Sequence, residues 1–233
     1  MSLYSIASNL SSKEKKVFSN SEIKLYSGIS ANSTSEYIYR LIKKSLIYKI
    51  EKNKFAISTD PFIVGSQILF PSYISFFPAF YLYHFTDQTI NELQIASSAR
   101  KNNIIFNGMK IEFIYMKPEL IFGYKKIKKD DSYIFLVDVK KLIIDIAYRP
   151  DIMGILPIGD IPLSRIKKKT LEIYLNKVKI EAVRRRVGYI MECLGMNLNI
   201  KPRNNSVYKL NPYNKNPGKY IVKWKLYDNE VNY

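Results

Sequence analysis

The sequence predicts an α+β protein in which a small N-terminal domain precedes a larger mixed α/β domain. In the first 60 residues, two helix-start signals are followed at once by two short strand-like runs, and beyond Pro61 runs rich in β-branched and aromatic residues alternate with amphipathic stretches. The composition supplies a core for both parts, because 47% of the 233 residues are hydrophobic, with 12 Phe and 19 Tyr among them. We therefore expect one domain at residues 1–60 and a second at residues 61–233.

The first helix of the small domain is predicted from its two ends. Ser19-Asn20-Ser21-Glu22 has the S-x-x-E pattern of a capping box, in which a hydroxyl and a carboxylate bind the free amides of a helix start. Gly28 occupies the position, about two turns later, where helices commonly end in the left-handed conformation. The segment Gly28-Ile29-Ser30-Ala31-Asn32 is then the turn of a helix-turn-helix.

The second helix is predicted over about residues 34–45. A second S-x-x-E pattern, Ser33-Thr34-Ser35-Glu36, marks its start, and Ile38, Leu41 and Ile42 fall on one apolar face. The core of this domain is expected to hold Ile23, Leu25, Ile38, Leu41, Phe55 and Ile57.

A β-hairpin is predicted directly after this helix. Residues 47–50 and 55–57 are strand-like, and Asn53 between them tolerates the positive φ of a tight turn. A helix-turn-helix followed at once by a hairpin is the order of a winged helix, so residues 1–60 are predicted to be a winged helix-turn-helix domain.

The polar face of the second helix indicates double-stranded DNA as a partner. Short hydroxyls at a helix start suit base edges, and cations further along the helix and at the hairpin tip suit phosphates. A solvated polar face would explain the helix by itself equally well. The preceding helix, the glycine turn and the basic hairpin together favour DNA binding. The expected DNA-binding residues are Ser33, Thr34, Ser35, Tyr37, Arg40, Lys44, Lys52, Asn53 and Lys54.

The charge of the chain agrees with a polyanionic partner. Lys and Arg outnumber Asp and Glu by 37 to 20, which gives a net charge of +17. The alternative is that an AT-rich genome has enriched the chain in lysine. Residues 151–233 are the most basic part, and a second polyanion surface or a solvated face is expected at Lys167, Lys168, Lys169, Lys177, Lys179, Arg184 and Arg185.

The larger domain is expected to begin with two short buried helices joined at Pro71, because residues 61–86 carry no formal charge. Two prolines and several polar residues argue against a membrane span there. Strands are predicted at 93–97, 104–106, 110–115, 133–137 and 219–226, and helices at 139–148, 164–177 and 179–194.

The sequence holds no combination of residues that predicts an enzyme. His84 and Cys193 are the only residues of their types, so no disulfide, metal or cofactor is expected, and His84 is interpreted as a packing residue. Asp138 and Asp145 lie on one helical face, where we expect a helix cap and a buried hydrogen bond. The start of the chain shows no secretory signal, which favours a cytoplasmic protein.

The order of segments resembles a known family, the AbiEi-type antitoxins of type IV toxin–antitoxin systems. "IEKNKFAIS" is similar to that family's basic K-R-G-x-Y wing, with Asn53 in place of glycine and Phe55 in place of tyrosine. "PSYIS" and "YHFTDQ" resemble the helix pair that opens the antitoxin domain, with Phe85 in place of glycine. "VDVKKLIIDIAYRPD", "RRRVGYIMECLG" and the closing "KWKL" resemble later segments, and the second of the aspartates, Asp145, is kept while Lys140 replaces an acid.

The resemblance implies a non-catalytic protein that represses its own operon through the winged helix. Its larger antitoxin-type domain would counteract a nucleotidyltransferase-type toxin, without direct contact being required. The alternative is a stand-alone winged-helix regulator whose larger domain binds a ligand or dimerises.

Overall fold

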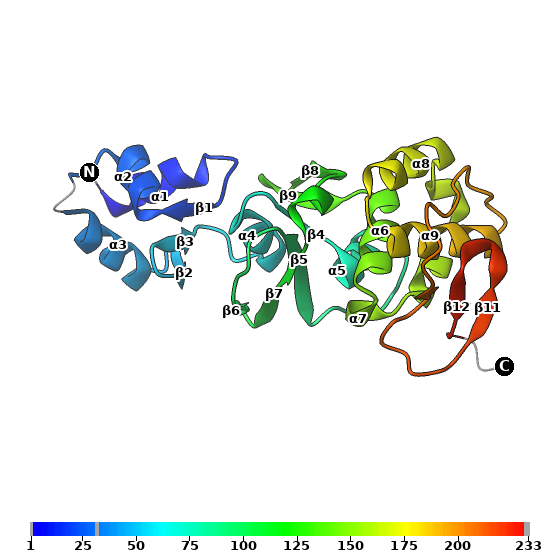
Figure 1. Ribbon diagram of the computed structural model, residues 1–233. Helices are drawn as coiled ribbons and strands as arrows, with labels where there is room; N and C mark the ends of the chain where they lie inside the picture. The colour runs from blue at the N-terminus through cyan, green and yellow to red at the C-terminus, as the bar shows by residue number, and fades with distance from the viewer. Residues whose placement is uncertain (1, 31–32, 231–233) are drawn as a thin grey trace. The chain divides into compact units, whose positions relative to one another are not determined.

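The protein is a mixed α+β structure of helices and three separate sheets (Figure 1). The computed structural model describes residues 2–30 and 33–230. Two compact units make up the chain, and each combines several segments: Met1–Ile74, Ile90–Ile121 and Lys125–Leu136 in unit 1; Ser75–Thr89, Phe122–Tyr124 and Val137–Tyr233 in unit 2. The boundary expected after residue 60 lies inside unit 1 and stays a prediction.

Residues up to 60 form a three-helix module with a small sheet. Its elements are α1 (Leu3–Ser11), β1 (Val17–Ser19), α2 (Asn20–Ser27), α3 (Thr34–Lys43), β2 (Tyr48–Glu51) and β3 (Lys54–Ala56). The strands pair antiparallel in the order β1-β3-β2. The helices close over a buried cluster that includes Ile6, Ile23, Leu41 and Phe55.

The predicted start and end of α2 are confirmed. The Ser19 Oγ atom accepts from the amide of Glu22 at 3.2 Å, and the Glu22 carboxylate accepts from the amide of Ser19 at 2.8 Å. Gly28 has φ +65° and lets the helix end in the left-handed conformation. Of the expected turn that follows, Ala31 and Asn32 lie outside the described residues.

Two elements of the module were not predicted. Helix α1 carries Leu3, Ile6, Ala7 and Leu10 at helical spacing, a pattern that the sequence does contain. Strand β1 has only three residues and exists because β3 provides a partner for it. One expected core residue is wrong, since Leu25 is 74% exposed.

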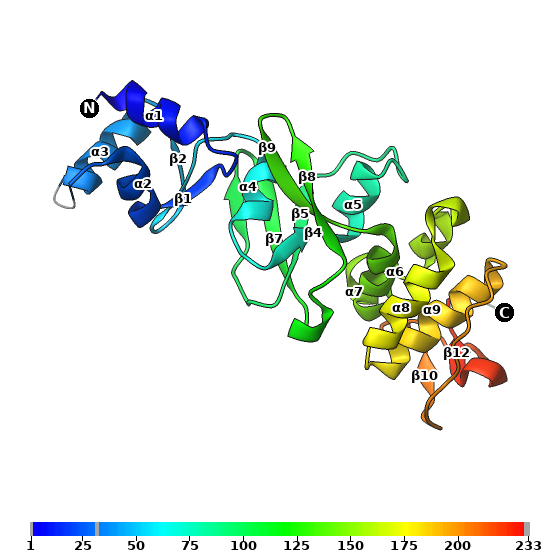
Figure 2. The same cartoon turned by 90° about the horizontal axis from the view of Figure 1, so that it is seen from above.

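The rest of unit 1 is built on a six-stranded sheet in the order β6-β7-β5-β4-β9-β8. These strands are β4 (Ser72–Ile74), β5 (Glu92–Ser97), β6 (Ile104–Phe106), β7 (Met109–Tyr115), β8 (Tyr124–Lys129) and β9 (Ser132–Val137). Helix α4 (Pro61–Gln67) lies across β5 and β7 (Figure 2). Gly65 permits this approach, because a Cβ atom there would meet Leu93 Cδ2 at 2.5 Å.

The segment around Pro71 is more than a junction of two helices. Helices α4 and α5 (Phe76–Leu82) are present as expected, but β4 lies between them and pairs with both β5 and β9. The uncharged sequence is explained by this central position, because β4 is buried along its whole length.

Unit 2 is mainly helical, and α6 (Val139–Tyr148) packs against its neighbours on several sides (Figures 1 and 2). Unit 2 also contains α5, together with α7 (Pro150–Met153), α8 (Lys168–Lys177) and α9 (Glu181–Cys193), and the 3-10 helices η3 (Leu156–Asp160) and η4 (Leu163–Arg165). The predicted strand over 219–226 is wrong. Its residues form β11 (Lys219–Ile221), the 3-10 helix η5 (Val222–Trp224) and the start of β12 (Leu226–Asp228), which pairs with β10 (Tyr208–Lys209) as well as with β11.

No helix within residues 2–30 or 33–230 combines the length and apolar character that crossing a bilayer requires.

Candidate nucleic-acid interface

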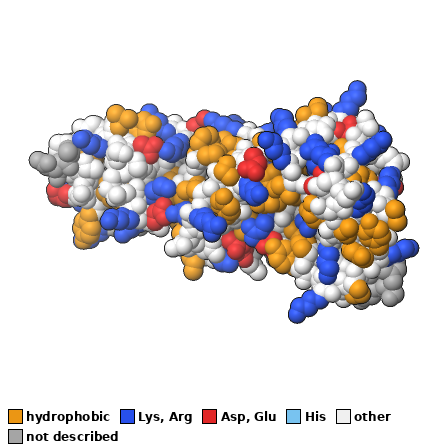
Figure 3. Space-filling view, viewed as in Figure 1, with side chains coloured by type: hydrophobic (Ala, Val, Ile, Leu, Met, Phe, Trp, Pro, Cys, Tyr) orange, Lys and Arg blue, Asp and Glu red, His pale blue; other side chains and the backbone are white. Residues whose placement is uncertain are grey.

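Helix α3 presents a continuous polar and basic stripe. Two adjacent rows at i, i+4 and i+8 make up this stripe, and all of their members are exposed: Ser35, Tyr39 and Lys43 in one row, Glu36, Arg40 and Lys44 in the other. Tyr39 is 64% exposed, which places an aromatic ring among the cations. Figure 3 shows Lys and Arg side chains beside a hydrophobic one at the lower edge of the module, over α3.

The opposite side of α3 fixes the orientation of this stripe. Ile38 and Leu41 are buried in the cluster formed with α1 and α2, and Tyr37 and Ile42 pack against its margin. Burial of these apolar side chains fixes the rotation of α3 about its own axis, so the exposed rows face the solvent.

The structure divides the predicted hydroxyl residues. Ser35 is exposed, but Thr34 is 7% exposed and its hydroxyl donates to the Ser30 carbonyl at 2.9 Å. Ser33 is partly buried and accepts from the Ser30 hydroxyl at 3.1 Å. Of the three, only Ser35 is therefore free to address a base edge without a change in the module.

The second capping box is a wrong prediction. Ser33 has helical backbone angles (φ −95°, ψ −12°) and its side chain makes no cap hydrogen bond. Without an extended cap residue, the Glu36 side chain does not fold back on the helix start, and it pairs with Arg40 at 2.6 Å instead. Arg40 and Lys44 are exposed as predicted, whereas Tyr37 is half-buried at the edge of the stripe.

Tyr39 and Lys43 were not among the residues predicted from the sequence. Both belong to the stripe. The sequence would have predicted both if every position off the apolar face of Ile38 and Leu41 had been included. The prediction took Ser33, Tyr37, Arg40 and Lys44, which run obliquely around the helix. This set shares only Arg40 and Lys44 with the exposed stripe.

The hairpin tip is Lys52 and Asn53, both exposed. Asn53 has φ +60°, as predicted for the turn, and its side chain accepts from Asn20 at 3.1 Å, which ties the tip to α2. Lys54 does not project from the tip. Its Nζ atom donates to the Ile68 carbonyl at 2.7 Å and lies 3.3 Å from Glu51.

The proposed second basic surface is only partly exposed. Lys167, Lys168, Lys169, Lys177 and Lys179 are exposed around α8, but the three arginines at 184–186 are 4%, 1% and 7% exposed. Arg184 and Arg185 are therefore removed from this surface.

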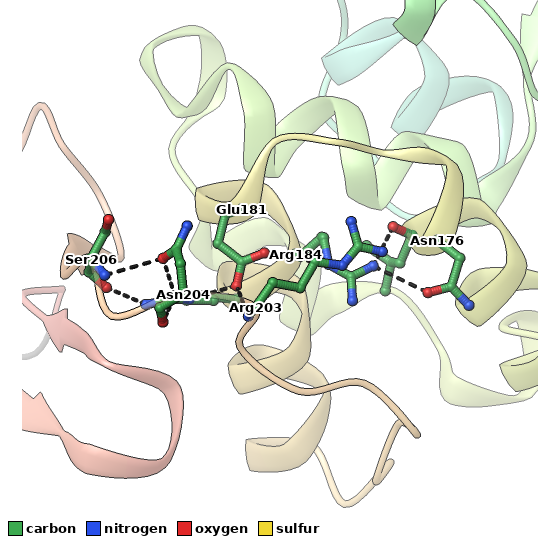
Figure 4. Close-up of polar contacts among 8 residues, drawn as sticks. Asn176, Glu181, Arg184, Arg203, Asn204 and Ser206 are labelled. Atoms are coloured by element: carbon green, nitrogen blue, oxygen red, sulfur yellow. Dashed lines mark hydrogen bonds and ion pairs between the residues drawn. The ribbon is translucent and has the colours of Figure 1, made fainter.

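Arg185 and Arg186 tie segments that follow α9 to the helices of unit 2. Arg184 ties α9 to the end of α8 (Figure 4). Arg185 pairs with Glu181 at 2.9 Å and donates to the Asn204 side chain at 2.7 Å. In Figure 4, Arg184 reaches towards Asn176, and it donates to the Leu175 carbonyl at 2.6 Å. Arg186 donates to the Ala147 carbonyl at 2.8 Å, and burial lowers the pKa of Arg186 to about 10.

The side chains that could have been catalytic or metal-binding are Asp138, Asp145 and His84, and the two aspartates have structural roles. Asp138 caps α6 through the amides of Lys140 and Lys141, and Asp145 is fully buried and accepts from the Ser75 hydroxyl at 2.8 Å, as predicted. His84 is exposed with φ +57°, so its interpretation as a packing residue is wrong. Within the described part of the chain, no group of three or more His, Cys, Asp or Glu could hold a metal ion.

No protein-family model matches this chain, and no curated protein matches it. The function must therefore be argued from the residues themselves.

Proposed function

We propose that this protein binds double-stranded DNA through α3 and the tip of the β2–β3 hairpin, with its N-terminal module acting as a winged helix. The observation that carries the proposal is the element order α1-β1-α2-α3-β2-β3, with a three-stranded antiparallel sheet and an exposed basic stripe on α3. This order supports the proposal, because a recognition helix followed by a hairpin wing is the arrangement of winged-helix DNA-binding domains.

The stripe has the chemistry that a major groove requires. Ser35 stands at the start of α3, where a hydroxyl meets base edges, and Lys43 and Lys44 stand at its end, where ammonium groups meet phosphates. On binding DNA, Arg40 would leave its ion pair with Glu36 and contact the DNA instead. A planar guanidinium can donate two hydrogen bonds to a phosphate or to a guanine, as it does to a carboxylate. The Tyr39 ring adds contact area beside the backbone.

The hairpin tip would contribute Lys52 and Asn53 to the adjacent phosphate backbone. Lys54 is assigned a structural role within unit 1, because its ammonium group already donates to the Ile68 carbonyl and lies beside Glu51.

The experiment is a salt titration of binding to DNA from the region upstream of the gene. The logarithm of the binding constant should fall linearly with the logarithm of salt, and Lys43→Ala, Lys44→Ala and Lys52→Ala should each reduce the slope by about 0.9. Lys117→Ala, an exposed lysine elsewhere in unit 1, is the matched control and should leave the slope unchanged. An unchanged slope in all three test variants would exclude α3 and the hairpin as the interface.

We further propose that the protein is an antitoxin and autorepressor of a type IV toxin–antitoxin operon. The order of sequence segments supports this role, in which the part of the chain beyond the module counteracts a nucleotidyltransferase-type toxin without necessarily contacting it. A stand-alone regulator with a ligand-binding or dimerising second part is the alternative.

A further inference from the structure

Unit 2 contains a small cavity of about 270 Å³ between η3, α9 and the end of β12. Most of its wall is apolar and includes Leu156, Leu194 and Leu210. Its size is near the lower end of the range of about 300–1,000 Å³ for ligand sites in proteins, which suits a small molecule.

Two carboxylates line this otherwise apolar cavity. Asp228 is 5% exposed, and its Oδ2 atom accepts from the Tyr189 hydroxyl at 2.7 Å. Glu230 follows two residues later, and its Oε1 atom is buried without a hydrogen-bond partner among the described residues. Burial and the bond to Asp228 raise the pKa of Tyr189, so the phenol stays a neutral donor.

Neither carboxylate is paired with a Lys or Arg within residues 2–30 and 33–230. This is unusual in a chain with 37 cations and 20 acids. Asp228 is buried and Glu230 is half-buried, whereas two other buried acids of unit 2 have cationic partners: Asp145 has Lys141, and Glu181 has Arg185. A buried carboxylate without a counter-ion is costly, and a bound cation would remove that cost.

We propose that the cavity binds a small organic cation with an apolar body, such as a protonated amine on an aromatic or aliphatic group. The ammonium group would lie between Asp228 and Glu230, and the apolar body would fill the space against Leu194 and Leu210. This inference is independent of DNA binding, because it uses residues of unit 2 alone.

A larger hollow in unit 1, of about 600 Å³, offers no comparable argument. Its two charged residues, Lys16 and Asp131, are paired with each other at 2.6 Å, and hydroxyl groups make up much of the remaining polar wall. No unpaired charge is left there to select a ligand.

Cys193 provides the readout for a test. It lines the cavity, its side chain is exposed, and it is the only cysteine in the chain, so alkylation of the protein by iodoacetamide reports on this position alone. A ligand in the cavity should shield the thiol.

The experiment measures the alkylation rate of the full-length protein by intact mass, with 2-phenylethylamine as the probe. At a concentration about ten times its Kd, the amine should slow alkylation about tenfold, because only the free protein reacts. The neutral 2-phenylethanol should protect at higher concentration only, and the anionic 3-phenylpropionate should not protect. Equal protection by the amine and the alcohol, or none by the amine, would overturn the proposal.

Two variants test separately the carboxylate charge of Glu230 and the volume of the cavity. Glu230→Gln should weaken protection by the amine about tenfold while leaving protection by the alcohol unchanged. Gly159→Val should abolish protection by both, because a side chain at Gly159 would point towards Leu194, and its backbone does not require glycine. Asp160→Asn, an exposed acid beside the cavity that does not line it, is the control. Full protection in Glu230→Gln, or in a Gly159→Val protein that melts like the wild type, would show that the amine binds elsewhere.

Discussion

At the scale of single residues, two serines with the same sequence pattern have different roles. Ser19 closes a capping box with Glu22, whereas Ser33 makes no cap hydrogen bond. Ser19→Ala should therefore lower the free energy of unfolding by about 1 kcal/mol, and Ser33→Ala should lower it by less. Urea denaturation of both variants measures this, and an equal loss in Ser33→Ala would mean that Ser33 supports α3 in a way other than capping.

Residues of this kind set the limit of prediction from sequence. The S-x-x-E pattern is identical at both helix starts, and only the backbone angles before α3, which depend on how the chain leaves α2, decide whether a cap forms. The predictions of Leu25 as a core residue and of Lys54 as a projecting DNA contact were wrong for a related reason. Their neighbours in space, solvent for Leu25 and the Ile68 carbonyl for Lys54, are not encoded in the local pattern.

Glu51 makes the stability of unit 1 depend on pH. Burial opposes its ionisation, but the ammonium groups of Lys101 and Lys54 outweigh burial and hold the pKa of Glu51 below its usual value of 4.5. Because the folded pKa is the lower one, this pairing stabilises the protein above about pH 4.5 and is lost as the pH falls through the folded pKa.

Glu51→Gln should therefore be less stable than the wild type by a constant amount above about pH 5, and the difference should shrink at lower pH. Thermal denaturation at a series of pH values measures it. In a Lys101→Met background the same substitution should have a smaller effect, and an unchanged effect there would remove Lys101 as the cause.

At the scale of elements, α6 depends on an ion pair that is completely buried. Lys141 and Asp145 are both 0% exposed and paired one helical turn apart, and burial lowers the pKa of Lys141. Lys141→Met alone should cost about 3–5 kcal/mol, because the buried Asp145 carboxylate loses the ammonium group that compensates its charge. The double variant Lys141→Met/Asp145→Leu should lose less, and chemical denaturation compares them. A double variant whose loss equals the sum of the losses in Lys141→Met and Asp145→Leu would show that the two side chains are not coupled.

Elements with a strong local pattern were predicted well. Helix α6 matches the predicted range of 139–148, and β6 matches 104–106, because periodicity and flanking turn residues mark both. Strand β8, with the sequence YKKIKK, has little apolar pattern and was missed. Strands β1 and β4 are three residues each, so their pairing partners rather than their own sequences make them strands.

At the scale of the whole molecule, hydrogen bonds join residues on either side of the domain boundary that the sequence predicts at residue 60. The amide of Lys16 donates to the Gln67 side chain at 2.7 Å, and the hydroxyl of Ser132 donates to the Glu14 carbonyl at the same distance. Such long-range hydrogen bonds have no local sequence signal. They explain why the N-terminal module and the six-stranded sheet belong to one unit although Asp60-Pro61 has the composition of a linker.

The two proposed roles can be separated in the intact chain, because they assign DNA binding and protection to different parts of it. The triple variant Arg40→Ala/Lys43→Ala/Lys44→Ala changes exposed residues of α3 only and should lose affinity for the operon's own promoter DNA. If the protein is an antitoxin that acts through the remainder of the chain, this variant should still protect cells from a neighbouring nucleotidyltransferase-type toxin expressed from an independent promoter. Cell survival is the readout, and the Lys117→Ala protein is the control. A stand-alone regulator predicts no protection by either protein. Protection by the control but not by the triple variant would contradict the proposed division, because protection would then require DNA binding through α3.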